Sequence, residues 1–278
     1  MERLQRERLC SFEHVPLNSQ NSTLKFPIQI IAESEDWIVV DKPPHLEVHP
    51  SKPNGRVTLW DELRELLAYE LANGGQVSIV NRLDRETSGV TLVAKHHAAA
   101  RALHLEMQAR AVEKEYLALV WGWPAVAEFE IDAPILRQGT RQPSRIHLKR
   151  MVHPDGASAR TRFRLEKRFM SKGGGRFSLL RAFPQTGRMH QIRVHLAHAG
   201  LPVVGDKIYG PDELCYLEFI DTGWTPTLAE RLLLPRHALH SAVLRLSGRQ
   251  LAWSAPLATD LAAWVGENLL ATPESEPI

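Results

Sequence analysis

Residues 80–95, VNRLDRETSGVTLVAK, decide how this chain folds around a group of four charged residues. An acid, Asp84, stands between Arg82 and Arg85, and the segment continues at once into a Thr-Ser-Gly triplet. Two short apolar runs typical of buried strands flank it, at residues 77–80 and 90–94. Thr and Ser hydroxyls can bond the local backbone in a turn, and Gly adopts positive φ without steric cost. The stretch therefore predicts a tight polar turn between two strands.

The position of Asp84 predicts an ionised carboxylate. On extended backbone, Arg82 and Asp84 share one face and Leu83 is left for the core. A neighbouring positive charge favours the carboxylate form, so Asp84 can act as a nucleophile or base but not as an acid at neutral pH. The alternative is a plain Arg–Asp ion pair that closes a turn.

The rest of the chain mixes helices and strands in one body. Apolar periodicity predicts helices within residues 58–75, 97–112, 186–200 and 259–270, with Thr58 and Thr186 as caps for the first and third. Strands are expected at residues 37–44, 115–122 and 159–169. In the last of these, arginines alternate with Thr161, Phe163 and Leu165, which predicts one cationic and one apolar face. We expect an N-terminal extension at 1–29, a catalytic domain at 30–270 and a tail at 271–278.

Composition excludes several classes of protein. Among 278 residues, no apolar run approaches the roughly 18 residues that span a bilayer. The first twelve residues lack the apolar stretch of a secretory signal, so we expect a cytoplasmic protein. Cys10 and Cys215 are far apart and have no metal-ligand spacing, and the histidines at 190, 195 and 198 do not share one helix face. We expect no metal.

The net charge of +2 conceals a strong asymmetry. Residues 137–193 contain fifteen Lys or Arg and only two acids, Asp155 and Glu166. Charge segregated in this way is typical of a surface that meets a polyanion, although a solvated basic face is the simpler alternative. Arg188, His190 and Arg193 lie at the start of a predicted helix, where the helix dipole favours phosphates.

Several blocks of the sequence, in order, resemble the RNA pseudouridine synthases of the large-subunit rRNA and tRNA branch. They are residues 31–50 (IAESEDWIVVDKPPHLEVHP), 81–95 (NRLDRETSGVTLVAK), 112–122 (VEKEYLALVWG) and 184–210 (PQTGRMHQIRVHLAHAGLPVVGDKIYG). The resemblance runs from about residue 30 to 256. It implies an α+β fold with a mixed, largely antiparallel, bent central sheet and flanking helices. It also implies isomerisation of specific uridines without a cofactor.

The resemblance assigns roles to individual residues. Asp84 is the expected catalytic aspartate, Tyr116 the aromatic residue that stacks on the flipped base, and Arg193 the basic partner of Asp84. Arg82 is expected to fill the space that the base leaves. We also assign Arg85, Thr87, Arg188 and His190 to RNA binding. Asn81 departs from the family pattern, which has His at that position.

RNA, as rRNA or tRNA, is the partner that these features predict. We expect no membrane, no DNA and no cofactor, and a monomer. Two alternatives compete with the enzyme: an RNA-binding or assembly factor without activity, and a hydrolase that uses Asp84 as nucleophile. The carboxylate facing RNA argues against the first, and the absence of a second catalytic carboxylate or a Ser/His pair at recognisable spacing argues against the second.

Overall fold

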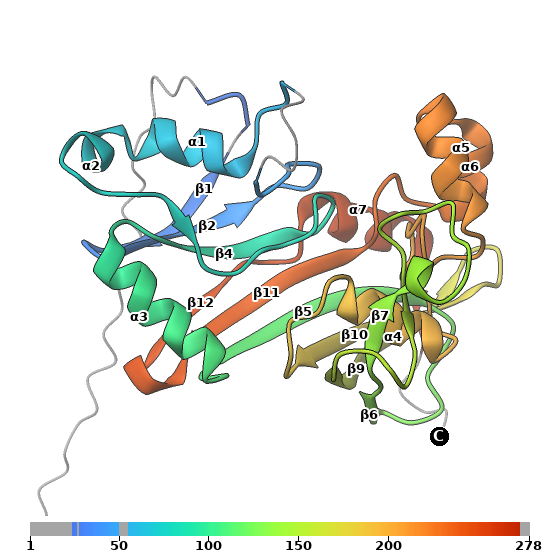
Figure 1. Ribbon diagram of the computed structural model, residues 1–278. Helices are drawn as coiled ribbons and strands as arrows, with labels where there is room; N and C mark the ends of the chain where they lie inside the picture. The colour runs from blue at the N-terminus through green and yellow to red at the C-terminus, as the bar shows by residue number, and fades with distance from the viewer. Residues whose placement is uncertain (1–23, 27, 50–54, 273–278) are drawn as a thin grey trace, which may run out of the picture.

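One mixed sheet runs through almost the whole chain (Figure 1). The structure is a computed structural model that describes residues 24–26, 28–49 and 55–272. The sheet has eleven strands. They are β1 (Gln29–Glu33), β2 (Trp37–Lys42), β3 (Ser78–Ile79), β4 (Ser88–Ala94), β5 (Val112–Trp121), β6 (Glu128–Asp132), β9 (Arg160–Ser171), β10 (Arg176–Pro184), β11 (Leu239–Leu246), β12 (Leu251–Ser254) and β13 (Leu269–Ala271). A separate two-stranded sheet contains β7 (Ile135–Arg137) and β8 (Arg150–Val152).

The strand order β1-β2-β4-β11-β5-β10-β9-β13 brings distant parts of the chain together at the centre of the sheet. β4 and β11 are parallel, and every other pair along this order is antiparallel. Register shifts in β1, β9 and β11 mark bulges, which bend strands. The predicted α+β class, with a mixed and largely antiparallel sheet, is confirmed.

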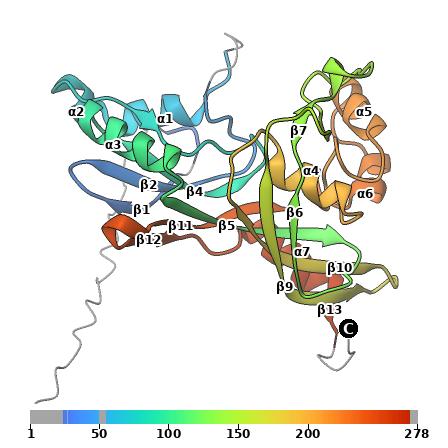
Figure 2. The same cartoon turned by 60° about the horizontal axis from the view of Figure 1, so that its bottom comes forward.

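The helices form two groups at opposite ends of the sheet (Figures 1 and 2). At the end with β1, β2 and β4 are α1 (Leu59–Leu66), α2 (Ala68–Ala72) and α3 (His97–Gln108). At the other end are α4 (Gln191–His198), α5 (Leu214–Thr222) and α6 (Pro226–Leu232). α7 (Thr259–Asn268) leads into β13, and two 3-10 turns lie at Gln138–Thr140 and Ser247–Arg249. None of the described helices has the length and apolarity needed to cross a membrane.

Both faces of the sheet near β2 are buried, as its β-branched run predicts. Ile38 packs in the main core with Leu59 and Leu63 of α1. Val39 points to the opposite side, where Leu103 of α3 covers it. The Thr58 cap is confirmed, because its hydroxyl accepts from the amide of residue 61 in a capping box.

Two predicted helices differ from the observed ones. The helix expected within 58–75 is interrupted at Leu67, which has φ of −102° and remains buried in the core. The helix expected within 186–200 begins only at Gln191 and is not capped by Thr186. The reason is local: Thr186 and the Arg188 amide both donate to the Gln191 side-chain oxygen, which holds residues 186–190 in a loop.

The cationic face of β9 has a partner that we did not predict. Thr161 and Phe163 are buried and Arg160, Arg162 and Arg164 are exposed, as expected. However, β6 pairs with β9 and sets its acidic residues, Asp132, Glu130 and Glu128, opposite these three arginines in the same order. Opposite charges across a strand pair stabilise a sheet, so part of this face has a structural role.

The proposed domain limits stay predictions. Most of the expected extension at 1–29 and residues 273–278 of the expected tail lie outside the described residues. Within the described part, the sheet already includes residue 29 and extends to residue 271 in β13.

Candidate active site

Asp84 lies in a loop that closes as a tight turn just before β4. The Thr87 amide donates to the Asp84 carbonyl oxygen over 3.1 Å. Gly89 has φ of 111°, as predicted. A Cβ atom at Gly89 would lie 2.2 Å from the Ser241 carbonyl oxygen, so the close approach of β11 also requires glycine. The turn is confirmed, although residues 80–87 form a loop rather than a continuation of the strands.

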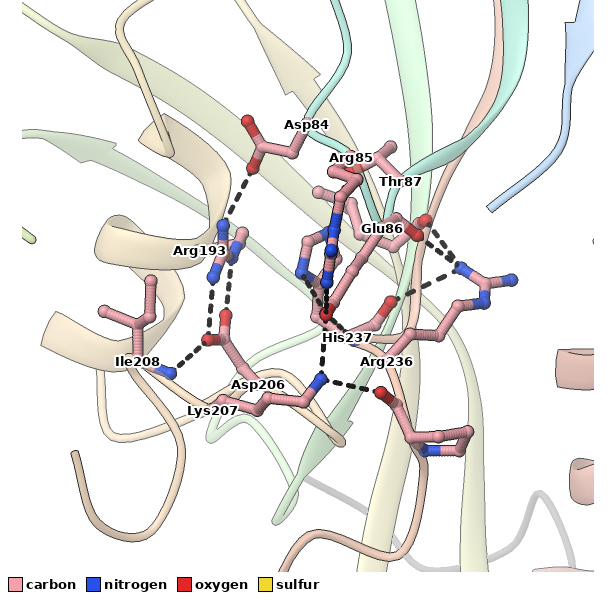
Figure 3. A network of polar contacts seen from close by, with 12 residues as sticks. Asp84, Arg85, Glu86, Thr87, Arg193, Asp206, Lys207, Ile208, Arg236 and His237 are labelled. Atoms are coloured by element: carbon pink, nitrogen blue, oxygen red, sulfur yellow. Dashed lines mark hydrogen bonds and ion pairs between the residues drawn. The ribbon is translucent and has the colours of Figure 1, made fainter. Parts of the chain in front are cut away.

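The Asp84 carboxylate meets a guanidinium group from the second half of the chain (Figure 3). Arg193 Nη1 donates to Asp84 Oδ2 over 2.8 Å. Arg193 Nε and Nη2 donate to the two oxygens of Asp206 over 2.6 and 2.8 Å. The amides of Ile208 and Tyr209 also donate to Asp206, each over 3.0 Å. Arg193 is thus fixed by Asp206 and presents its remaining nitrogen to Asp84.

Asp84 is open to solvent, whereas its partners are buried. Its side chain is 28% exposed, compared with 5% for Arg193 and 0% for Asp206. Burial alone would raise the pKa of Asp84, but His190 and Arg193 outweigh it and hold the pKa below its usual value. Asp84 Oδ1 accepts no hydrogen bond from the described residues. An ionised carboxylate with one oxygen held and the other free can serve as a nucleophile or base.

His190 lies beside this pair and is neutral at pH 7. Burial and the charge of Arg193 lower its pKa to about 4. Its Nδ1 atom is 2.8 Å from the Tyr209 hydroxyl, and its Nε2 atom is 4.0 Å from Asp84 Oδ1. His190 is the N-cap residue of α4, but its side chain is buried against the protein rather than exposed to solvent there. With the imidazole uncharged, Arg193 is the cation that keeps Asp84 ionised near pH 7.

Strand register brings Tyr116 of β5 to the same site. Tyr116 lies opposite Ser241 of β11, and Ser241 lies opposite Gly89 at the start of β4. The tyrosine is 9% exposed. Burial raises its pKa to about 12, and the charge of Asp84 contributes in the same direction. The phenol is therefore neutral, and the structure brings Asp84, Tyr116 and Arg193 together as the sequence predicted.

Lys42 holds the loop of Asp84 through the carbonyl oxygen of Arg85. Its place at a strand end before two prolines is typical of an exposed loop, yet the side chain is fully buried. Its Nζ atom donates to the carbonyl oxygens of Pro43, Leu46 and Arg85 over 2.8, 2.9 and 3.1 Å. Burial, with the positive charge of Arg236, lowers its pKa to about 7.

A second cluster, around Glu86, fixes the other side of the loop (Figure 3). Lys207 Nζ donates to Glu86 Oε1 over 2.8 Å, and the His237 amide donates to Oε2 over 3.2 Å. The fully buried Arg236 donates to the Glu86 carbonyl oxygen over 3.0 Å and pairs with Asp260. The loop is therefore held by Lys207 and by residues 236–237, two segments that are distant from it in sequence.

The turn hydroxyls bond other side chains rather than their own backbone. Thr87 Oγ1 lies 2.8 Å from His237 Nε2, and Ser88 Oγ lies 3.0 Å from His240 Nδ1. Thr87 is buried, so the structure places this predicted RNA contact in the interior. His237 precedes β11 and His240 lies within it, and both side chains are buried.

Neither arginine of the opening stretch pairs with Asp84. Arg82 is exposed and has no ion-pair partner among the described residues. Arg85 lies 3.4 Å from Glu86 and lines a small pocket with His45. Arg188 is exposed on the loop before α4, where its Nε donates to the Ser158 carbonyl oxygen over 3.0 Å. The interpretation of a local Arg–Asp pair is thus wrong for Asp84.

Sequence reasoning missed Asp206 as the residue that orients Arg193. One signal was present: Asp206 follows Gly205 directly after two apolar residues, in VVGDKIYG (203–210). A buried acid needs a cation or several amide donors, and Asp206 has both. Across the described residues, no group of three or more His, Cys, Asp or Glu side chains could hold a metal ion.

Known proteins are similar to this chain in sequence and in fold. The family model for RNA pseudouridylate synthase matches residues 36–198. An uncharacterized RNA pseudouridine synthase of Chloroflexus aurantiacus is 42% identical over 228 residues, 80% of this chain and 63% of that protein. Ribosomal large subunit pseudouridine synthase D of Nitrosomonas europaea is 38% identical over 243 residues, 85% of this chain and 64% of that protein. The Escherichia coli K12 protein of the same name is 35% identical over 272 residues, 92% and 77% of the two chains.

The chain spans less than two thirds of the length of the first two relatives. Among solved structures, human RNA pseudouridylate synthase domain containing 1 has a TM-score of 0.66 at 23% identity, covering 91% of each chain. Human RNA pseudouridylate synthase domain containing 4 also has a TM-score of 0.66, at 22% identity, covering 86% of this chain and 92% of that one. These two show the shared fold. The matched segment contains Asp84, Tyr116 and Arg193, and the chain belongs to the RNA pseudouridine synthase family.

Proposed function

We propose that this protein isomerises specific uridines to pseudouridine in structured RNA, either rRNA or tRNA. In this reaction the N1–C1′ bond breaks, the uracil rotates, and a C5–C1′ bond forms. The C5 proton is lost and N1 gains one, so the atoms balance without a co-reactant. One observation carries the proposal: an ionised, partly exposed Asp84, held by Arg193 at 2.8 Å, in a chain of this family.

The other proposed roles follow from the same geometry. Tyr116 is a neutral aromatic residue beside Asp84 and is suited to stack on an extruded uracil. Arg193 keeps the aspartate ionised and oriented. Arg82, exposed and unpaired within the described structure, is available to enter the space that the base leaves. Removing a base from its stack costs a few kcal/mol, so stacking surface and an occupant both matter.

The basic segment, residues 137–193, still supports RNA binding when the cations that form ion pairs within the protein are left out of the count. Six of its fifteen cations form ion pairs with described acids: Arg141, Lys149, Arg160, Arg164, Arg181 and Arg193. The remaining cations exceed the two acids of that segment and can neutralise phosphates. Two relatives named ribosomal large subunit pseudouridine synthase D favour rRNA over tRNA as the substrate. A monomer, a cytoplasmic location and the absence of DNA, membrane and cofactor remain part of the proposal.

The competing function is an RNA-binding or assembly factor without activity. Such a protein gains nothing from an acceptor-only carboxylate turned toward RNA phosphates. Asp206 also holds Arg193 against Asp84, which keeps that carboxylate ionised and oriented as a catalyst requires.

Asp84→Asn tests the proposal, because it removes the charge and keeps the shape. Pseudouridine formation is measured as tritium release from transcripts of large-subunit rRNA and of tRNA labelled at uridine C5. We expect wild-type protein to release tritium from one of them and the variant to release none, with RNA affinity within about threefold of wild type. Asp212→Asn is the matched control, because Asp212 is also a partly exposed carboxylate paired with an arginine, Arg231, and is not among the site residues. A normal rate in Asp84→Asn would show that this residue is not the catalyst.

A further inference from the structure

The imidazole of His190 lies between two groups of the site, on a backbone of unusual conformation. His190 has φ of 58°, in the left-handed region that non-glycine residues seldom occupy. Residues held in such regions cluster at functional sites. Its Nδ1 atom lies 2.8 Å from the Tyr209 hydroxyl, and its Nε2 atom lies 4.0 Å from Asp84 Oδ1. Each ring nitrogen therefore has its own neighbour.

Tyr209 decides which nitrogen of His190 carries the proton. The Arg150 amide donates to the Tyr209 oxygen over 2.9 Å, and an amide N–H can only donate. Burial raises the pKa of Tyr209, so the phenol keeps its own proton. Among the described residues, His190 Nδ1 is the one acceptor bonded to that hydroxyl. Nδ1 therefore accepts from Tyr209, and the neutral imidazole carries its proton on Nε2.

One short turn orients both groups that face Asp84. The Tyr209 amide donates to Asp206, which in turn holds Arg193. The Tyr209 ring lies edge-on to the imidazole of His190, with 5.6 Å between the ring centres. The Arg193 guanidinium carbon lies 5.1 Å from the centre of the Tyr209 ring. His190 and Arg193 are thus fixed relative to each other and face different oxygens of the Asp84 carboxylate.

A gap separates His190 Nε2 from Asp84 Oδ1. At 4.0 Å the two atoms are too far apart for a direct hydrogen bond, and neither bonds another described residue. Neither is sealed from solvent, because the only sealed side-chain atoms without a partner in the described part of the chain are Trp121 Nε1 and Arg168 Nε. One atom of a substrate can therefore lie about 2.8 Å from both of them.

The chemistry of this gap selects a hydroxyl group. His190 Nε2–H is a donor, whereas the ionised Asp84 carboxylate is an acceptor only. A uracil carbonyl oxygen could accept from His190 but has no proton for the carboxylate, and the uracil N3–H could not accept. A hydroxyl accepts from one and donates to the other. Within an RNA strand the 3′ and 5′ oxygens are esterified, so the free hydroxyl of a nucleotide is its ribose 2′-OH.

We propose that His190 and Asp84 together bind the 2′-hydroxyl of the target nucleotide, with His190 Nε2 donating and Asp84 Oδ1 accepting. The proposal rests on the proposed function, in which bonds to C1′ break and form beside Asp84, because C2′ is bonded to C1′. Oδ1 keeps a second lone pair for the reaction. His190 thereby contacts the substrate as a neutral donor and makes the site select ribose over deoxyribose.

Rates of tritium release from ribose and deoxyribose substrates test this contact. The RNA that wild-type protein modifies is remade with a single 5-tritiated uridine, or 5-tritiated 2′-deoxyuridine, at the modified position. We expect wild type to prefer ribose. His190→Phe keeps an aromatic ring and removes the donor, so the ratio of the two rates should fall by about 5- to 150-fold, as for a donor that loses its partner. His190→Gln, whose amide can donate, should recover part of the ratio.

His195→Phe is the matched control, since it makes the same replacement in α4, the helix that His190 begins. Both ring nitrogens of the buried His195 bond groups outside the site, the Thr161 hydroxyl and the Ala133 carbonyl oxygen. A loss of packing slows both substrates alike, so this variant should keep the wild-type ratio. The proposal is overturned by a wild-type ratio in His190→Phe, by an equal fall in His195→Phe, or by wild-type protein that uses both sugars equally.

The position of the proton on His190 is measured without any substrate. Nitrogen-15 spectra of the histidine side chains at pH 7 should show His190 protonated on Nε2, and Tyr209→Phe should allow the Nδ1-protonated form to appear. Protonation on Nδ1 in the wild-type protein overturns the proposal. Wild-type protein that releases no tritium from any RNA refutes the proposed function itself, a result on which these spectra do not depend.

Discussion

Replacing Asp206 by Asn should lower the stability of the folded protein far more than replacing Asp84 by Asn. Asp206 is fully buried and accepts two hydrogen bonds from Arg193 and two from backbone amides. The Asp206→Asn variant would leave the buried guanidinium with only the partly exposed Asp84, and the new side-chain amide would face other donors. Breaking a buried ion pair from one side costs about 3–5 kcal/mol. We therefore expect the free energy of unfolding to fall by about that amount.

Urea denaturation at pH 7, followed by circular dichroism, measures this loss. Asp84→Asn is the matched control, and we expect it to change stability by about 1 kcal/mol or less because its carboxylate is partly exposed. The pKa of Asp206 is lowered in the folded protein, so its stabilisation is present above the unfolded pKa of about 3.9 and is lost as the pH falls below it. The gap between wild type and Asp206→Asn should therefore narrow below about pH 4. A loss under 1 kcal/mol at pH 7 would refute the reasoning.

Three further predictions follow from the buried groups around the site. The pKa of Lys42 is about 7 in the folded protein and about 10.4 in the unfolded chain, so between these pH values folding releases a proton and the free energy of unfolding rises with pH. Lys42→Met should lack this rise in the free energy of unfolding, measured by urea denaturation from pH 7 to 10. The same rise in the variant as in wild type would contradict the prediction. Gly89→Ala places a Cβ atom against the Ser241 carbonyl oxygen at a residue with φ of 111°, so it should lower the free energy of unfolding by more than about 2 kcal/mol. Thermal unfolding measures this loss, and wild-type stability in the variant would contradict the prediction. Because the pKa of His190 is about 4, His190→Gln should leave the shape of the rate profile between pH 5.5 and 8 unchanged, and loss of an inflection there would show that the imidazole titrates during catalysis.

The sequence predicts which candidate site residues lie together better than it predicts the contacts that hold them. The turn at Asp84, the strand of Tyr116 and the fold class follow from local patterns and from the family blocks. The partner of Asp84 does not follow from proximity in sequence: two arginines flank it, yet Arg193, 109 residues later, makes the ion pair. Periodicity and turn chemistry are local, whereas this pair depends on how distant strands are ordered.

The same dependence on distant contacts explains why the sequence did not predict the acids opposite β9 or the burial of Lys42. Alternating arginines correctly predicted one exposed cationic face, but only the register with β6 shows that acids lie opposite them. Lys42 ends a strand and precedes two prolines, a position typical of an exposed loop. Three carbonyl oxygens converge on its ammonium group instead, and nothing in the local sequence encodes that convergence.

The parallel pairing of β4 with β11 has a consequence during synthesis. The loop that contains Asp84 is held by residues that lie about 150 positions later in the chain. Thr87 is hydrogen-bonded to His237, and Arg236 donates to the Glu86 carbonyl oxygen. A ribosome adds about 5–20 residues per second, so the nascent chain spends roughly 8–30 seconds without these contacts. The loop that carries Asp84 therefore cannot reach its folded arrangement until residues 236 and 237 have been synthesised.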